Sequence, residues 1–212
     1  MEFEGLCTHV GNELKRRFWE HKAMAALSRG RVRMDGWLKV ELTAILAQIG
    51  EAEPAFKLPK GRAAVRFGDW LVEVASLPTA FVCEGTKAAS GDLAEDVKDL
   101  RKLIKRLRKG RGRYRAAVFF AVYPFGDMDE AAWASHKVRI ERSLGGPLVE
   151  DRFSFQGGVT GRLYAGLVQE KAAVEPMAEQ GPAATEKRPM GRPRRSSVPV
   201  LKKERITLPS QA

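Results

Sequence analysis

Cysteine, histidine and long apolar runs are all scarce in this chain of 212 residues. Cys7 and Cys83 are far apart with no CxxC spacing, and only three histidines accompany them, so the sequence predicts no zinc site. Isolated thiols are typical of reduced cysteines in a cytoplasmic protein, which is the localisation that we expect. No apolar run is long enough for a membrane-spanning helix. The acidic start, residues 1–4, does not resemble a secretory signal.

Acidic residues are too few to balance the basic ones, and the net charge is +11. The excess is concentrated in two segments. Residues 98–115 contain ten Lys or Arg and one acid, and residues 171–212 contain nine Lys or Arg and four Glu. Such basic segments favour an anionic partner, and duplex DNA is the one that we expect. No membrane partner is expected, and the sequence leaves the oligomeric state open.

Hydrophobic residues make up 44% of the chain, which is enough to form a packed core. Apolar periodicity predicts helices over 6–27, 35–49, 92–109 and 128–144, with Asp35 and Asp92 as N-caps. Alternation predicts strands within 55–82, and a continuous apolar run predicts a buried central strand over 116–123. Two short strands, 153–155 and 162–168, would close the sheet. This order indicates an α/β or α+β sandwich.

The composition divides the chain into three parts. Residues 1–34 form an N-terminal helical segment, and residues 35–170 form the core. Residues 171–212 are rich in Pro, Ala, Glu, Lys, Arg and Ser and have no periodic apolar face, so we expect a disordered basic tail.

A two-residue turn at Gly68-Asp69 predicts a hairpin whose register can be written out. In this register Phe67 faces Trp70 and Ala64 faces Glu73. One face of the hairpin is apolar and contains Ala63, Val65, Phe67, Trp70, Val72 and Val74. The other contains Arg62, Ala64, Arg66, Leu71, Glu73 and Ala75, which places a single acid between two arginines.

The helix 35–49 with an internal Glu41, the hairpin with Glu73, the helix with Asp-Leu-Arg-Lys-Leu at 99–103 and the buried strand occur in an order that resembles the PD-(D/E)XK nuclease core. The resemblance covers about residues 35–168. It implies a restriction-endonuclease-like α/β fold with a central mixed sheet flanked by helices. In that family, carboxylates hold Mg²⁺, and a lysine positions the attacking water. Glu73 and Glu41 match the family's metal-binding glutamates.

Two positions depart from the family pattern. Ala64 stands where the strand aspartate belongs, and Ala75 stands where the lysine belongs. We therefore expect a relative with weak or absent catalysis. An active Mg²⁺-dependent endonuclease would use Glu41, Asp69 and Glu73, with Lys60 or Arg62 in the role of the lysine. Alternatively, Glu41 reaches solvent or pairs with an arginine.

The basic helix and the tail supply the candidate DNA contacts. In the helix and just after it these are Lys98, Arg101, Lys102, Lys105, Arg106, Lys109, Arg111 and Arg113. In the tail, Arg188, Gly191, Arg192, Pro193, Arg194 and Arg195 belong to a segment that resembles an AT-hook, although Met190 replaces the first arginine of that motif's core. The alternatives are a merely solvated helix face and a surface that binds an acidic protein partner.

Overall fold

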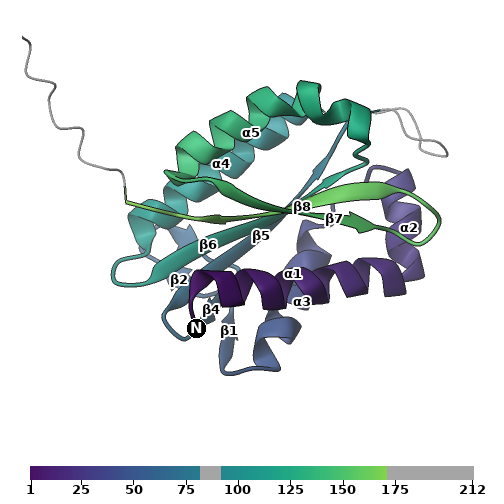
Figure 1. Cartoon of the computed structure of the whole chain (residues 1–212). Helices are drawn as coiled ribbons and strands as arrows, with labels where there is room; N and C mark the ends of the chain where they lie inside the picture. Colours follow the sequence, from purple (N-terminus) through teal and green to yellow (C-terminus); the bar gives the residue numbers. More distant parts are fainter. Residues whose placement is uncertain (82–91, 171–212) are drawn as a thin grey trace, which may run out of the picture. The chain divides into compact units, whose positions relative to one another are not determined.

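The computed structural model describes residues 1–81 and 92–170, which form an α/β unit with a mixed six-stranded sheet and helices on both faces (Figure 1). The expected tail, including its AT-hook-like segment, lies outside the described residues. Within the two described ranges, no helix combines the length and the apolar character needed to cross a membrane.

The helices are α1 (Phe3–Glu20), α2 (Lys22–Arg29), α3 (Asp35–Ala47), α4 (Leu93–Gly110) and α5 (Glu130–Leu144), and a 3₁₀ turn, η1 (Asp127–Asp129), precedes α5. The prediction of one helix over 6–27 was wrong, because His21 adopts an extended conformation that separates α1 from α2. Asp92 caps α4 by accepting a hydrogen bond from the Ala94 N–H, as predicted. Asp35 is not an N-cap; it is the first residue of α3, and its carboxylate bonds to a strand.

The large sheet contains β1 (Ala52–Pro54), β4 (Val65–Phe67), β5 (Trp70–Pro78), β6 (Arg115–Tyr123), β8 (Thr160–Leu167) and β7 (Leu148–Ser154), in that order across the sheet. A separate small hairpin joins β2 (Lys57–Leu58) to β3 (Gly61–Arg62). The pair β5–β6 is parallel and the other pairs are antiparallel. The parallel pair requires a crossover, and α4 provides it.

The buried strand predicted over 116–123 is confirmed, because β6 lies between β5 and β8 and its residues from Ala116 to Tyr123 are buried. The strand predicted over 153–155 was too short. β7 begins at Leu148, and it was missed because its residues from Val149 to Arg152 are exposed on an edge strand and most are charged.

The hairpin register is confirmed between Phe67 and Trp70 and between Val65 and Val72. The predicted alternation was wrong beyond Val65. Ala63 packs with the apolar residues that face α4, whereas Ala64 packs with those that face α1 and α3. β4 begins only at Val65, so the side chains before it need not alternate between the two faces of the sheet.

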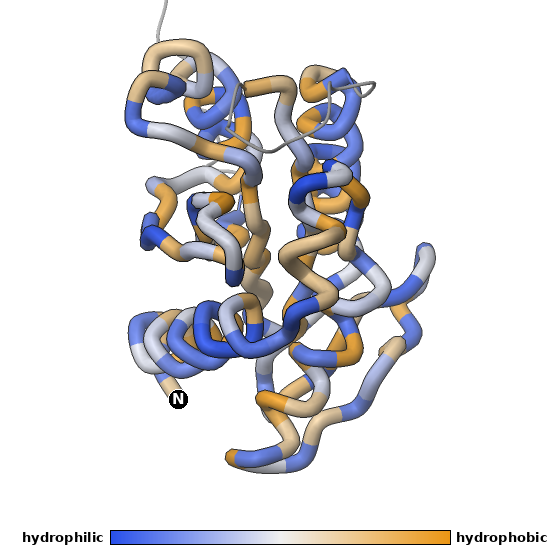
Figure 2. Tube along the Cα trace, turned by 90° about the vertical axis from the view of Figure 1, so that its right-hand side faces the viewer, coloured by the Kyte–Doolittle hydropathy of each residue, from blue (hydrophilic) through white to orange (hydrophobic). Residues whose placement is uncertain are grey.

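Two apolar layers hold the unit together. On one face of the sheet, α1, α2 and α3 pack against alternate residues such as Val72, Val74 and Phe119. On the other face, α4 and α5 pack against Leu71, Phe120 and their neighbours. Figure 2 shows apolar residues along the strands and polar residues along the outer sides of the helices. Glu73, which alternates with Leu71 and Ala75, therefore belongs to the face that α4 covers.

Candidate functional site

Glu73 is a buried acid in the middle of β5, with 1% of its surface exposed. Its Oε1 atom accepts one long hydrogen bond from Arg106 Nη2 of α4, at a distance of 3.4 Å. Its Oε2 atom is buried and accepts no hydrogen bond of normal geometry from the described residues, although the backbone N–H groups of Val74 and Ala64 lie near the carboxylate. A buried polar atom without a partner is costly, and such atoms concentrate where a ligand can supply the missing bond. Glu73 is therefore the starting point for a site.

Glu73 lines a pocket of about 380 Å³ between α3, the end of β1, β3 and α4. We call it the Glu73 pocket. Its charged lining residues are Lys39, Arg62, Glu73 and Arg106, and its other lining residues are Val40, Thr43, Pro54, Ala55, Ala63 and Ala64. Ala55 has φ = 53°, a left-handed conformation that costs free energy in a residue other than glycine. Three cations thus surround one buried carboxylate.

Burial raises the pKa of Glu73 above its ordinary value. The positive charges of Lys39 and Arg106, and more weakly the backbone N–H groups of Val74 and Ala64, act in the opposite direction. A raised pKa means that the folded protein binds this proton more tightly than the unfolded chain does. Ionised Glu73 therefore destabilises the fold, and the destabilisation grows as the pH rises from the ordinary carboxyl pKa through the raised one.

We accordingly expect Glu73→Gln to stabilise the protein at neutral and alkaline pH, because the amide carries no charge to bury. The gain is about 1 kcal/mol in the free energy of unfolding, or a rise of about 2–4 °C in Tm. It should disappear as the pH falls below the ordinary carboxyl pKa, where Glu73 becomes protonated in both states. Thermal denaturation from pH 4 to pH 9 measures it. Glu53→Gln, which changes an exposed carboxylate on β1, is the control and should show no such gain. A wild type more stable than Glu73→Gln at pH 8 would contradict the expectation.

The charged residue that α3 contributes to the Glu73 pocket is Lys39, not Glu41. Glu41 pairs with Arg17 of α1, so the alternative in which it reaches an arginine is what the structure shows. Residues two positions apart in an α-helix, such as Lys39 and Glu41, are separated by about 200° around its axis. The rotation of α3 that brings Lys39 to the pocket therefore turns Glu41 toward α1. The structure thus does not bring the two predicted metal ligands, Glu41 and Glu73, to one pocket.

The remaining residues predicted at a catalytic site are dispersed. Asp69 is exposed at the β4–β5 turn, and Lys60 is exposed at the turn between β2 and β3; neither lines the Glu73 pocket. Of the two arginines expected beside Glu73, Arg62 lines the pocket, while Arg66 pairs with Glu53 on β1. In residues 1–81 and 92–170, no cluster of three or more His, Cys, Asp or Glu side chains could hold a metal ion.

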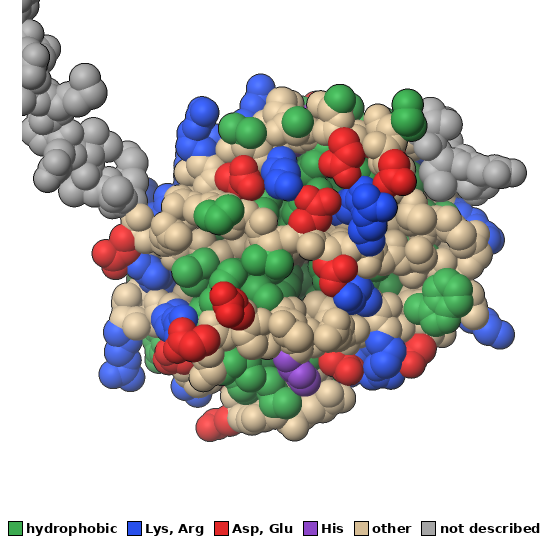
Figure 3. All heavy atoms as spheres, in the orientation of Figure 1, with side chains coloured by type: hydrophobic (Ala, Val, Ile, Leu, Met, Phe, Trp, Pro, Cys, Tyr) green, Lys and Arg blue, Asp and Glu red, His purple; other side chains and the backbone are tan. Residues whose placement is uncertain are grey.

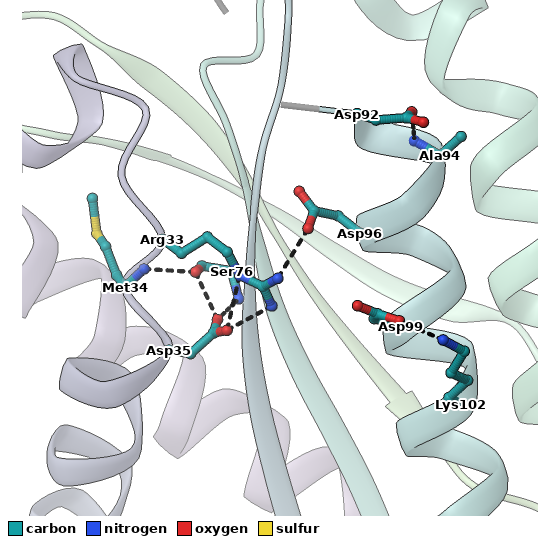
Figure 4. Close-up of polar contacts among 9 residues, drawn as sticks. All are labelled: Arg33, Met34, Asp35, Ser76, Asp92, Ala94, Asp96, Asp99 and Lys102. Atoms are coloured by element: carbon teal, nitrogen blue, oxygen red, sulfur yellow. Dashed lines mark hydrogen bonds and ion pairs between the residues drawn. The ribbon is translucent and has the colours of Figure 1, made fainter. Parts of the chain in front are cut away.

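A polar anchor sets the position of α3, and therefore of Lys39 (Figure 4). The Asp35 carboxylate accepts hydrogen bonds from the Ser76 N–H, at 2.6 Å, and from the Ser76 Oγ, at 2.7 Å. Arg33 joins the anchor by ion pairs with Asp35, at 2.7 Å, and with Asp96 of α4, at 3.0 Å. Lys39 lies four residues after Asp35, on the same side of the helix. The first turn of α3 is thus tied to β5, the strand that holds Glu73.

Outside the pocket, the β2–β3 hairpin and the C-terminal half of α4 lie side by side. A Cβ atom on Gly110 would lie 3.3 Å from the Leu58 side chain, and one on Gly61 would lie 3.1 Å from the Arg106 side chain. The rings of Phe56 and Tyr114 also make an edge contact across this junction, with centroids 5.6 Å apart.

The β2–β3 hairpin and residues 105–109 of α4 carry six exposed bases, which we call the basic surface: Lys57, Lys60, Arg62, Lys105, Arg106 and Lys109. Only Arg106 among them pairs with an acid of the described residues. Arg62 and Arg106 belong to both the basic surface and the Glu73 pocket, so the pocket opens within it. Lys57 and Lys60 of the hairpin were not among the predicted DNA contacts. Nothing in the sequence groups them with the bases of α4, because the two segments are far apart in the chain.

The other bases predicted on α4 and just after it divide into two groups. Arg101 and Arg111 have structural bonds: Arg101 donates to Ser143 Oγ of α5, and Arg111 pairs with Glu170. Lys102 pairs with Asp99 on its own helix. Lys98 and Arg113 are exposed and form no ion pair with a described acid. The exposed bases without an acidic partner are therefore the better candidates for binding an anion.

The side of the protein that presents α1 and β7 differs. Figure 3 shows acidic and basic side chains next to one another over much of this side. They include the pairs Lys15–Asp151 and Lys137–Glu150. Neutralised charges of this kind attract a polyanion weakly, so this side is a weaker candidate for binding an anion than the basic surface.

No protein-family model, no curated protein and no solved structure matches this chain. The function must therefore be argued from the site itself.

Proposed function

We propose that this protein binds duplex DNA through the basic surface, on a nuclease-like core in which catalysis is weak or absent. The observation that carries the proposal is the junction of the β2–β3 hairpin and α4, where five exposed bases have no acidic partner among the described residues. A phosphate backbone supplies the missing counter-charges, and binding of this kind requires no base-specific contact.

The nuclease-like assignment rests on the order of elements. A helix (α3), three antiparallel strands (β1, β4 and β5), a crossover helix (α4) and a parallel strand (β6) follow one another in the order expected of the PD-(D/E)XK core. Weak or absent catalysis is supported by the alanines at positions 64 and 75 and by the pairing of Glu41 with Arg17. One carboxylate among three cations does not fit Mg²⁺, which is usually held by carboxylates together with waters or phosphates.

We expect the full chain to bind a mixed-sequence duplex with an affinity that depends strongly on salt. With about five phosphate contacts, the association constant should fall on the order of 10²-fold or more between 50 and 200 mM salt. Fluorescence anisotropy with a labelled duplex of about 20 base pairs measures this. A salt-independent affinity would contradict the proposal. Plasmid nicking with Mg²⁺ that is lost in Glu73→Ala would instead favour the active endonuclease.

The AT-hook-like segment of the tail adds a sequence-based part to the proposal. Its Gly-Arg-Pro core would enter the minor groove, and its flanking bases would contact phosphates. Replacing Arg192, Arg194 and Arg195 with glutamine separates this contribution from that of the core.

A further inference from the structure

The Glu73 pocket differs from a simple phosphate-binding patch, because a carboxylate lies in its wall. An internal phosphodiester carries a negative charge and no ionisable O–H group. Placed beside Glu73, it would be repelled by the carboxylate, with no proton of its own to share between the two anions. The pocket therefore favours a different anion from the backbone phosphates that the basic surface would hold.

A phosphate monoester satisfies the pocket better. Its second pKa is about 6, so a proton is available near neutral pH for a hydrogen bond between a phosphate oxygen and the Glu73 Oε2 atom. Oε2 accepts no hydrogen bond of normal geometry from the described residues and is buried, so a phosphate oxygen would satisfy it once the carboxylate turns toward the pocket. A monoester and Glu73 that share one proton carry two negative charges together, and the three cations Lys39, Arg62 and Arg106 more than balance them.

The size and position of the pocket point to the end of a nucleic acid strand. A volume of about 380 Å³ lies at the small end of ligand pockets and accommodates a phosphoryl group with its sugar, but no stretch of duplex. The pocket also opens within the basic surface, since Arg62 and Arg106 belong to both. A duplex lying on that surface could thus present its end to Glu73.

We infer that the Glu73 pocket binds the terminal phosphate monoester of a DNA strand, with Lys39, Arg62 and Arg106 as its cations and Glu73 as its hydrogen-bond partner. The inference rests on the proposed function, because the basic surface would hold the adjoining duplex. Free inorganic phosphate has the same chemistry and serves as a probe of the pocket alone.

The first experiment compares labelled duplexes of one sequence that end in 5′-phosphate, 3′-phosphate or hydroxyl groups, by anisotropy with the full chain at pH 7. We expect one phosphorylated end to bind about tenfold more tightly than the hydroxyl end, since a charged hydrogen bond is worth about this factor or more. Lys39→Gln should abolish the preference; the Lys39 side chain makes no hydrogen bond or ion pair with the described residues, so the fold should tolerate the change. Lys98→Gln, on α4 outside the pocket, is the matched control and should retain the preference.

The second experiment tests the role of Glu73 by competition with inorganic phosphate and with sulfate at matched ionic strength. Sulfate is a dianion that has no proton to share near neutral pH. We therefore expect phosphate to compete more strongly than sulfate for the wild type, and equally for Glu73→Gln, whose amide donates a hydrogen bond to either anion. Equal competition in the wild type would contradict the assignment of Glu73.

The outcomes separate the inference from the proposed function. Equal affinity for all three duplexes would overturn the inference and leave duplex binding intact. If no duplex binds, the proposed function fails. Calorimetric titration with inorganic phosphate then tests whether the Glu73 pocket binds phosphate by itself. Binding that is lost in Lys39→Gln supports the phosphate site, and absence of binding overturns it.

Discussion

Replacing Lys57, Lys60, Lys105 and Lys109 together with glutamine is expected to weaken duplex binding on the order of 10²-fold or more at 100 mM salt. Each of these lysines is exposed and has no acidic partner among the described residues, so each is available to displace a counterion from a phosphate. None of them lines the Glu73 pocket, so the variant leaves that site unchanged. Fluorescence anisotropy with a mixed-sequence duplex measures the loss.

A charge-matched control uses four bases from the other helices: Lys15, Arg16, Lys22 and Lys137. Their replacement removes the same net charge, and three of them pair with acids, so the affinity should fall by less than about fivefold. Equal losses in the two variants would mean that overall charge, and not the basic surface, governs binding.

Asp35→Ala is expected to cause the largest loss of stability, about 3 kcal/mol in the free energy of unfolding. The substitution leaves the N–H and the Oγ of buried Ser76 without their acceptor and removes the ion pair with Arg33. For a chain of this size, such a loss lowers Tm by about 6–12 °C. Chemical or thermal denaturation measures it.

Asp35→Asn is the matched comparison, because its amide oxygen still accepts from Ser76 while the charge is lost. We expect about a third of the cost, roughly 1 kcal/mol. An alanine variant within about 0.5 kcal/mol of the wild type would show that the anchor does not hold α3 on β5. Because Lys39 follows Asp35 by one turn, the alanine variant should also reduce phosphate binding.

The elements with strong local signals were predicted from the sequence. The turn at Gly68-Asp69 set the pairing of Val65 with Val72, and the continuous apolar run predicted the buried strand β6. Edge strand β7 was predicted too short because exposed, charged residues conceal the alternation. The break at His21 was missed because no glycine or proline marks it and apolar residues resume shortly after it, in α2.

The site was only partly predictable, for a physical reason. Glu73 was identified because it interrupts an apolar strand. Its neighbours, however, come from elements far apart in sequence: Lys39 from α3 and Arg106 from α4. No local pattern distinguishes Lys39 from Glu41 as the residue that faces the pocket, because the choice depends on how α3 is rotated against α1 and β5. That rotation is set by the Arg17–Glu41 pair and by the bonds between Asp35 and Ser76.

The most direct test of duplex binding by the basic surface is the slope of log K against log salt concentration, for the wild type and the four-lysine variant. Each lysine that neutralises a phosphate contributes about 0.9 to the magnitude of the slope. The proposal therefore predicts that the slope becomes shallower by about 3–4 in the variant and remains unchanged in the charge-matched control. Equal slopes in the wild type and the four-lysine variant would contradict it.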